Sequence, residues 1–309
     1  MTSKLLSIII PNFNGEESIR DTIRSAELSA RGVKFEVIVV DDCSTDDSQK
    51  ILKRINRNDK RLKVINNIKR RGAAFCRNIG AKKAEGKVLL FIDNDVFLKG
   101  DTAKKLVKSA LHNRGVSFPK IRFSNRRIMW PASKEEEKFL GISACFAIPK
   151  KLFKRVGFFD EAYETYLEDA DFFVRCKLNG VGFYYEKNAV AIHKVPKFYD
   201  GTRRYFLENR NLTYGMLKFL KIPKKEKSPF VLSSLLKNLV CGLFNFRWFD
   251  WSYYDRNLNF KEKVNLLFRK HRKLSQNCGC FTVLVFFVGI ITGLFRFFIS
   301  KSKTTFINK

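Results

Sequence analysis

Two aspartates, Asp93 and Asp95, stand one residue apart directly after the apolar run 88–92. If the chain stays extended there, both carboxylates point to the same side and lie close together. Two like charges at such a distance are unfavourable unless a positive charge lies beside them. A divalent cation that binds a diphosphate supplies that charge, and oxygen ligands favour Mg²⁺ or Mn²⁺. A helix cap or a solvated turn can carry the same short pattern, so the motif alone leaves both interpretations open.

A second acidic turn, Asp41-Asp42-Cys43-Ser44, follows the apolar run 35–40. A carboxylate there can accept hydrogen bonds from the imide N–H of uracil or thymine, or from ribose hydroxyls. The same residue types also cap helices. We expect Asp42 to contact a nucleotide and one residue of 44–46 to cap the next helix. Arg77 lies near the start of another predicted helix, where a phosphate group would be favoured.

The acidic segment Glu168-Asp169-Ala170-Asp171 begins a helix predicted at 169–179. Acidic residues are common at helix N-termini because they face the positive end of the helix dipole. Asp169 has an alternative use as a general base that takes a proton from an attacking hydroxyl group. His193 closes a strand predicted at 189–193, and it is either an ordinary core or surface residue or a metal ligand beside Asp95.

The elements that would position these residues alternate between strand and helix. Apolar runs predict strands at 5–10, 35–40, 62–65 and 88–92, and helices are predicted at 18–30, 48–57 and 73–84. This alternation indicates an α/β fold with a mostly parallel, Rossmann-like sheet flanked by helices. Ligands bind such sheets beyond the carboxyl ends of the strands. The polar clusters 11–14, 41–44 and 93–95 should therefore share one crevice.

The pattern loosens after about residue 100. Further strands are predicted at 116–118, 121–123, 142–148, 182–185 and 189–193, and helices at 150–156 and 169–179. We expect a domain of residues 1–222 that carries the site, followed by a basic, amphipathic helical region at 223–309.

In this order, the motifs resemble those of glycosyltransferase family 2, whose members are inverting enzymes with the GT-A fold. The resemblance covers about residues 5–220. It is carried by Ser7-Ile-Ile-Ile-Pro11-Asn-Phe13-Asn14, Val39-Val-Asp-Asp42-Cys-Ser44, Arg77-Asn78-Ile-Gly80, Phe91-Ile-Asp93-Asn-Asp95, Phe158-Phe-Asp160-Glu161 and Glu168-Asp169-Ala-Asp171. The segment Arg204 to Asn211 also looks like the stretch that follows the catalytic domain in rhamnosyltransferase-like members.

The resemblance implies a role for each matching residue. Pro11, Phe13 and Asp42 would line the pocket for the nucleotide base. Asp93 would contact the ribose or a metal-bound water. Asp95 would bind the divalent metal, His193 resembles the histidine that completes the metal site in some members, and Asp169 would be the catalytic base.

Two departures from family patterns narrow the expected activity. Many members that transfer sugars to dolichol phosphate have Glu directly after the residue that is Asn14 here, whereas this chain has Gly15 and then Glu16. Processive polysaccharide synthases carry Gln-x-x-Arg-Trp, but Phe244 precedes Arg247-Trp248 here. The second departure favours transfer of a single sugar over polymerisation.

The net charge of +30 points to an anionic partner. About half of the surplus lies in residues 201–309, interleaved with Phe, Leu and Trp. This mixture fits a membrane surface better than nucleic acid, for which no recognised module is present. Residues 281–299 carry one charge, Arg296, and are long enough to cross a hydrocarbon core of ~30 Å. A buried or interfacial helix, and a merely solubilising charge, are the alternatives.

The compartment follows from the cysteines and the N-terminal segment. Seven scattered cysteines predict free thiols in a reducing environment. The short apolar run at 5–10 does not match a signal peptide. We therefore expect an enzyme at the cytoplasmic face of the cell membrane, anchored by its C-terminal region.

The expected reaction is metal-dependent, inverting transfer of one sugar from a nucleotide-sugar donor to a lipid-linked glycan or other glycan acceptor. Direct transfer to a polyprenyl phosphate is the alternative enzyme activity. A catalytically silent binding or scaffolding protein on the same fold is the alternative outside the enzyme class.

Overall fold

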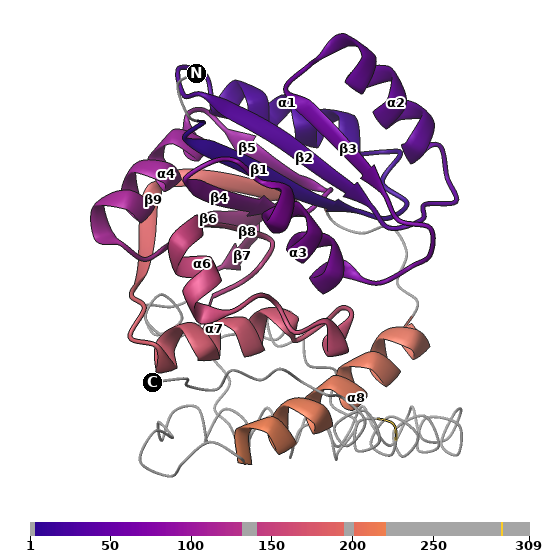
Figure 1. Cartoon of the computed structure of the whole chain (residues 1–309), viewed down its shortest axis with the longest axis vertical. Coiled ribbons are helices and arrows are strands. Elements are labelled where there is room, and N and C mark those ends of the chain that lie inside the picture. Colours follow the sequence, from indigo (N-terminus) through magenta and orange to yellow (C-terminus); the bar gives the residue numbers. More distant parts are fainter. Residues whose placement is uncertain (1–3, 132–140, 195–200, 221–291, 293–309) are drawn as a thin grey trace. The chain divides into compact units, whose positions relative to one another are not determined.

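The computed structural model describes residues 4–131, 141–194 and 201–220, together with Thr292 (Figure 1). The chain divides into two compact units, at residues 196 and 197. The first unit contains every described element except α8 (Gly201–Leu220), which belongs to the second. Among the helices of these described ranges, none is both long and apolar enough to cross a membrane. The region predicted at 223–309 and its apolar stretch 281–299 lie outside the described residues, apart from Thr292.

The N-terminal half of the first unit has the predicted alternation of strands and helices. The strands are β1 (Leu6–Asn12), β2 (Phe35–Asp41), β3 (Leu62–Asn66) and β4 (Val88–Ile92). The helices between them are α1 (Ile19–Ser29), α2 (Ser48–Asn58) and α3 (Ala73–Lys83). These four strands are parallel, and their carboxyl ends meet at one edge of the sheet.

The second half changes the character of the sheet. Its elements are β5 (Val96–Lys99), α4 (Thr102–Asn113), β6 (Val116–Phe123), β7 (Ile128–Trp130), β8 (Cys145–Pro149), α6 (Lys150–Val156), a 3-10 turn at Glu161–Tyr163, α7 (Glu168–Leu178) and β9 (Phe183–His193). The described strands form one nine-stranded sheet in the order β3-β2-β1-β4-β8-β6-β9-β5, with β7 paired to β6. Since β8 runs antiparallel to both β4 and β6, and β5 antiparallel to β9, the sheet is mixed. The prediction of a mostly parallel sheet is wrong for this half.

Two predicted breaks in the strands do not occur. The strands predicted at 116–118 and 121–123 are one strand, β6, in which the pairing with β9 shifts register between Pro119 and Lys120. Proline inside a strand is tolerated at such irregularities, so it does not end this one. Residues 182–185 and 189–193 likewise belong to the single strand β9. Helix α4 was not predicted, although its buried residues Ala103, Leu106, Val107 and Ala110 recur at helical spacing.

Helices cover both faces of the sheet (Figure 1). Helix α1 contacts α2 and α4 on one side, while α3, α6 and α7 lie on the other. A cluster of aromatic rings holds α6 and α7 against the sheet. The ring centroids of Phe153 on α6 and Phe91 on β4 lie 5.2 Å apart, as do those of Phe173 on α7 and Phe146 on β8. Stacked and edge-on aromatic pairs add to the stability from burial alone, so this cluster fixes the position of α7 and of the acidic residues at its start.

A buried ion cluster stabilises the sheet near the amino end of β2, away from the carboxyl ends of the strands. The Glu36 side chain on β2 has no exposed surface, and its carboxylate receives hydrogen bonds from Ser7 Oγ and the Glu85 amide, both at 2.7 Å. The ammonium of Lys63 lies 2.9 Å from the same carboxylate. Burial alone favours the neutral acid, but these partners outweigh it and lower the pKa of Glu36 to about 2.

We predict that Glu36→Gln lowers the free energy of unfolding at neutral pH by roughly 3 kcal/mol. The folded-state pKa is depressed, so the stabilisation is complete above the unfolded value of about 4.5 and is lost as the pH falls toward 2. The difference in unfolding free energy between wild type and variant, measured in urea from pH 7 to pH 3, should shrink through this window. A pH-independent difference would contradict the assignment.

Candidate functional site

A chain of side-chain hydrogen bonds joins the carboxyl ends of β2, β1 and β4. Asn12 Nδ2 donates to the Asp41 carboxylate at 2.8 Å, and Asn94 Nδ2 donates to Asn12 Oδ1 at 2.9 Å. Asn12 and Asp41 are direct neighbours in the strand register. The three polar clusters therefore share one edge of the sheet, as predicted from the topology.

The close approach of these side chains requires glycine at position 15. A Cβ atom on Gly15 would lie 2.3 Å from Asn12 Oδ1 and 2.4 Å from Asn94 Nδ2. We predict that Gly15→Ala breaks the Asn12–Asn94 hydrogen bond and destabilises the fold by about 1–3 kcal/mol, measured by urea unfolding. Equal unfolding free energies for Gly15→Ala and wild type would overturn this interpretation.

Local contacts hold the start of α2. The N-cap residue is Asp47, whose side chain makes no capping hydrogen bond, so the cap expected within 44–46 lies one residue later. Asp46 Oδ1 accepts a hydrogen bond from the amide of Ser48 at 3.0 Å. Glu16 Oε2 accepts from the amide of Asp47 at 2.9 Å. The Glu16 side chain is thus engaged at a helix start.

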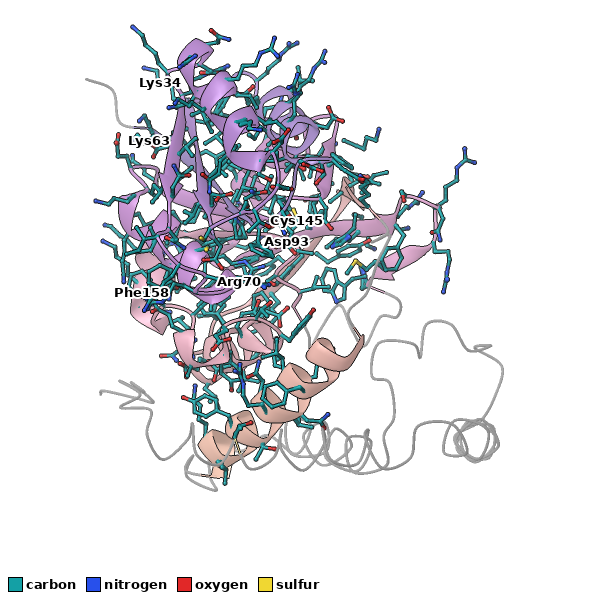
Figure 2. The ribbon with its side chains drawn as sticks, turned by 90° about the vertical axis from the view of Figure 1, so that its right-hand side faces the viewer. Lys34, Lys63, Arg70, Asp93, Cys145 and Phe158 are labelled. Carbon is teal, nitrogen blue, oxygen red and sulfur yellow. The ribbon has the colours of Figure 1, made fainter. Side chains whose placement is uncertain are left out.

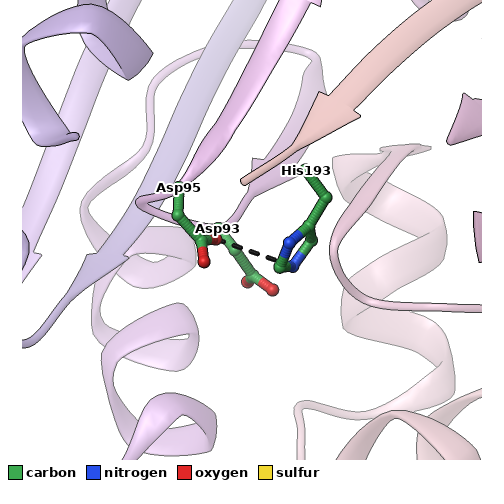
Figure 3. A group of neighbouring side chains, drawn as sticks. All are labelled: Asp93, Asp95 and His193. Carbon is green, nitrogen blue, oxygen red and sulfur yellow. Dashed lines mark ion pairs between the residues drawn. The ribbon is translucent and has the colours of Figure 1, made fainter. Parts of the chain in front are cut away.

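Asp93, Asp95 and His193 bring their ligand atoms within 4.8 Å of one another (Figure 3). The prediction that the two aspartates converge by strand alternation is wrong. They lie in a tight turn between β4 and β5, closed by a hydrogen bond from Val96 N to Asp93 O at 3.1 Å. His193 arrives from β9, whose pairing with β5 sets it opposite Val96. The turn and the long-range strand pairing together assemble the cluster.

The orientation of His193 suits a metal ligand. Its Nδ1 lies 2.9 Å from the carbonyl oxygen of Lys194, which can only accept, so Nδ1 carries the proton of the neutral ring. The lone pair of Nε2 then points toward Asp95 Oδ1, 3.6 Å away. An imidazole whose second nitrogen donates to a backbone carbonyl is the usual arrangement at metal centres.

The donor set fits a divalent cation. Burial raises the pKa of the Asp95 carboxyl, and the nearby Asp93 adds to the effect while His193 opposes it. The cluster is therefore short of positive charge, which a cation would supply. Carboxylate oxygens and a neutral imidazole nitrogen are ligands that Mg²⁺ or Mn²⁺ accepts, so Asp95 and His193 would hold such a cation with Asp93 beside them.

Asp169 lies in the first turn of α7 and is fixed by two backbone amides. Its Oδ1 accepts from the amide of Ala170 at 2.8 Å, and its Oδ2 accepts from that of Ser143 at 3.1 Å. Ala144 directly follows Ser143, and its carbonyl oxygen accepts a hydrogen bond from the amide of Asp93 at 3.1 Å. The two-residue segment 143–144 thus contacts both Asp93 and Asp169. In Figure 2, Asp93 lies near Cys145, the residue that follows this segment.

Arg77 is buried between two carboxylates. Its Nη2 donates to Asp93 Oδ1 at 2.6 Å, and its Nη1 donates to Glu168 Oε1 at 2.7 Å. Its side chain is only 3% exposed. Burial raises the pKa of Glu168 to about 7, against the opposing effect of Arg77. The expected contact of Arg77 with a nucleotide stays a prediction, because in this structure both terminal nitrogens are paired within the protein.

Asp42 anchors the segment that follows β3. Its Oδ1 accepts from the amide of Arg71 at 2.8 Å and its Oδ2 from the amide of Gly72 at 2.7 Å, and Asn67 Nδ2 donates to Oδ1 at 2.8 Å. The guanidinium of Arg70 lies 3.8 Å from the centre of the Phe13 ring. The structure therefore links Asp42 and Phe13 through residues 67–72.

Pro11, also predicted for the nucleotide pocket, is half-buried near the end of β1, next to Asn12. The predicted residues thus gather around the ends of β1, β2 and β4, together with the start of α7 and the end of β9. Sequence reasoning assigned no role to Asn12, Asn94 or Ser143. Asn12 and Asn94 sit inside motifs that were recognised, but their pairing depends on strand register. Nothing in the sequence marks Ser143, because it acts through its backbone amide.

A model of the family described as glycosyl transferase family 2 matches residues 7–172 of this chain. One curated relative, the Escherichia coli protein named UDP-Glc:alpha-D-GlcNAc-diphosphoundecaprenol beta-1,3-glucosyltransferase WfaP, is 40% identical over 30% of this chain and 36% of its own length. Another, the Staphylococcus aureus poly(ribitol-phosphate) beta-N-acetylglucosaminyltransferase TarS, is 32% identical over 41% of this chain and 26% of its own length. The matches span less than half of either relative.

Among solved structures, the mannosyltransferase PcManGT from Pyrobaculum calidifontis in complex with GDP-Man and Mn²⁺ is similar to this chain with a TM-score of 0.61. The two are 16% identical, and the match covers 97% of this chain and 89% of the other. At this level of identity the likeness supports the fold.

Proposed function

Since the chain belongs to glycosyltransferase family 2, we propose that it transfers one sugar from a nucleotide-sugar donor to a lipid-linked glycan or other glycan acceptor, with inversion at the anomeric carbon. The observation that carries this proposal is the segment 143–144, which contacts both Asp93 and Asp169. It contacts the backbone of Asp93, whose side chain belongs to the metal cluster, and the carboxylate of the candidate base Asp169.

Asp169 accepts the proton of the acceptor hydroxyl as that oxygen attacks the anomeric carbon of the donor. Its carboxylate is oriented for this by the amides of Ser143 and Ala170. Inversion requires a single displacement, in which the bond to the departing diphosphate breaks as the new glycosidic bond forms.

The residues at the other strand ends bind the donor. Asp42, Pro11 and Phe13 hold the nucleotide base, and Asp93 contacts the ribose or a water molecule. Asp95 and His193 hold the divalent cation, Mg²⁺ or Mn²⁺. When bound, the cation stabilises the negative charge that develops on the leaving diphosphate.

The named relatives support the substrate classes. WfaP is named for transfer from UDP-glucose to a sugar on diphosphoundecaprenol, and TarS for transfer to poly(ribitol-phosphate). PcManGT was solved with a nucleotide sugar and Mn²⁺. These names favour a nucleotide-sugar donor and a lipid-linked or polymeric glycan acceptor over a small free sugar.

The test is a screen of nucleotide sugars with Mn²⁺ or Mg²⁺, read first by thermal shift and then by acceptor-dependent release of nucleoside diphosphate. Lipid-linked sugars and bare polyprenyl phosphates are offered as separate acceptors. Turnover with lipid-linked sugars alone supports the proposal, and turnover with polyprenyl phosphates alone assigns the alternative reaction. Donor binding without turnover on any acceptor would favour a silent binding protein.

The sequence of the C-terminal region supports association with a membrane, and we propose that it brings the site to lipid-linked acceptors at the cytoplasmic face. Residues 223–309 combine basic with large apolar residues, a composition that favours anionic lipid surfaces. Flotation of the full chain with vesicles containing anionic lipid tests this. Absence of the chain from the floating fraction at low salt would refute it.

A further inference from the structure

Arg77 joins two segments that are distant in the sequence. It projects from α3, and its guanidinium contacts Asp93 in the turn after β4 and Glu168 at the start of α7. The side chains of Arg77 and Glu168 are 3% and 6% exposed, whereas that of Asp93 is 26% exposed. Arg77 therefore connects the partly exposed Asp93 with the buried Glu168, which directly precedes Asp169.

Stability alone does not account for this buried charge group. Desolvation of an ion pair commonly cancels its Coulombic gain, and apolar side chains of the same size are often as stabilising. The group is also incompletely satisfied. Arg77 Nε and Glu168 Oε2 are buried without a hydrogen-bond partner in the described structure. Such a costly arrangement is better explained by a requirement for position.

The start of α7 depends on such contacts as well as on its acidic first turn, because the residue before it does not cap the helix. The residue before the helix, Leu167, has a φ of +65° and provides no side-chain cap. Glu164 and Tyr166 also have positive φ values, which non-glycine residues rarely adopt. A strained backbone persists where the surrounding structure holds it in place. The contact between Glu168 and Arg77 lies directly after this strained segment and directly before Asp169.

We propose that Arg77 and Glu168 are positioning residues that set Asp169 relative to Asp93. Neither needs to touch a substrate for this. Asp93 and Asp169 are held through the backbone by residues 143–144 on one side, and through Arg77 and Glu168 on the other. The two connections together fix the distance between the donor site and the base. This inference rests on the proposed function, because it assigns Asp169 as the base.

The test compares Glu168→Gln with Glu36→Gln in the full chain. Glu168→Gln keeps the size of the side chain but removes its charge, which weakens its hold on Arg77. Glu36 is also a buried carboxylate with an ion-pair partner, but it lies near the amino end of β2, away from the carboxyl ends of the strands that carry the site. Glu36→Gln therefore makes the same chemical change in a buried ion pair without touching the link to Asp169.

We expect Glu168→Gln to lower kcat by about 100-fold, since a misplacement near 1 Å can cost that much, while the KM for the donor changes less than about threefold. Glu36→Gln should lower the melting temperature with kcat retained below it. A lysine in place of Arg77 has a single ammonium group and cannot bind both carboxylates as the guanidinium does. Because the contact with Glu168 is then already lost, we expect the double variant Arg77→Lys/Glu168→Gln to be no slower than Arg77→Lys alone.

Wild-type kcat in Glu168→Gln, or equal kcat losses in Glu168→Gln and Glu36→Gln, would overturn the inference. Strictly additive effects of Arg77→Lys and Glu168→Gln would overturn it as well. Failure of the proposed function looks different, because wild type would then show no transfer, or Asp169→Asn would transfer normally. Loss of transfer in Asp169→Asn with full activity in Glu168→Gln removes this inference alone.

Discussion

Replacement of Asp169 by Asn is expected to slow sugar transfer by about 10³-fold while leaving the affinity for the nucleotide sugar nearly unchanged. The Asn side chain has the same size, and its carbonyl oxygen can still accept a hydrogen bond from the amide of Ser143. What it loses is the ability to take a proton from the acceptor. The effect should therefore appear in kcat, measured by acceptor-dependent release of nucleoside diphosphate, with donor binding followed separately by calorimetry.

Asp171→Asn is the matched control for this variant. Asp171 lies in the same turn of α7, but its carboxylate pairs with Arg175 Nε at 2.9 Å, and Arg175 in turn holds the carbonyl oxygens of residues 156–158. This substitution should reduce stability and leave the rate per folded molecule close to that of wild type. If Asp169→Asn retained more than a tenth of wild-type kcat, another group would have to be the base.

Replacement of Asp95 by Asn is expected to abolish most metal-dependent donor binding. Loss of an outer-shell partner of a metal ligand typically costs 10–100-fold in metal affinity or activity, so loss of a charged ligand should cost at least about 100-fold. The Asn side chain removes one negative charge from the cluster with His193 and Asp93. Titration of Mn²⁺ into protein plus nucleotide sugar, read by calorimetry, would measure the shift.

Asp101→Asn provides the control for a general effect of charge. Asp101 precedes α4 and forms an ion pair with Lys105 at 2.8 Å on the surface. Its replacement should not change the Mn²⁺ dependence. Wild-type activity that persists undiminished after exhaustive chelation, or an Asp95→Asn variant with unchanged Mn²⁺ affinity, would speak against a metal site in this cluster.

The sequence predicts the N-terminal half of the first unit, because the signals for its strands and helices are local. The isoleucine-rich run before Pro11 and the valine-rich run before Asp41 each form a buried strand, and their parallel order places the polar residues after them at one edge. The sharing of that edge by three polar clusters follows from topology alone.

The rest depends on contacts between distant residues. The four-residue strand β5 is too short to show a periodic pattern, yet its pairing with β9 is what brings His193 to Asp95. Arg77 was expected to face a phosphate because it lies near a helix start. Its partner Glu168 is 91 residues away, and no local pattern could have indicated that both would be buried together. Local sequence patterns therefore reveal neither the contact of His193 with Asp95 nor that of Arg77 with Glu168.

The stereochemistry of the product tests the single displacement proposed for this enzyme. The full chain is incubated with Mn²⁺, the donor identified by the screen and a lipid-linked acceptor, and the anomeric configuration of the transferred sugar is read by NMR. A donor with an α-linked sugar should give a β-linked product, because the acceptor hydroxyl deprotonated by Asp169 displaces the diphosphate in one step. A product that retains the α configuration would contradict the single displacement and the role assigned to Asp169.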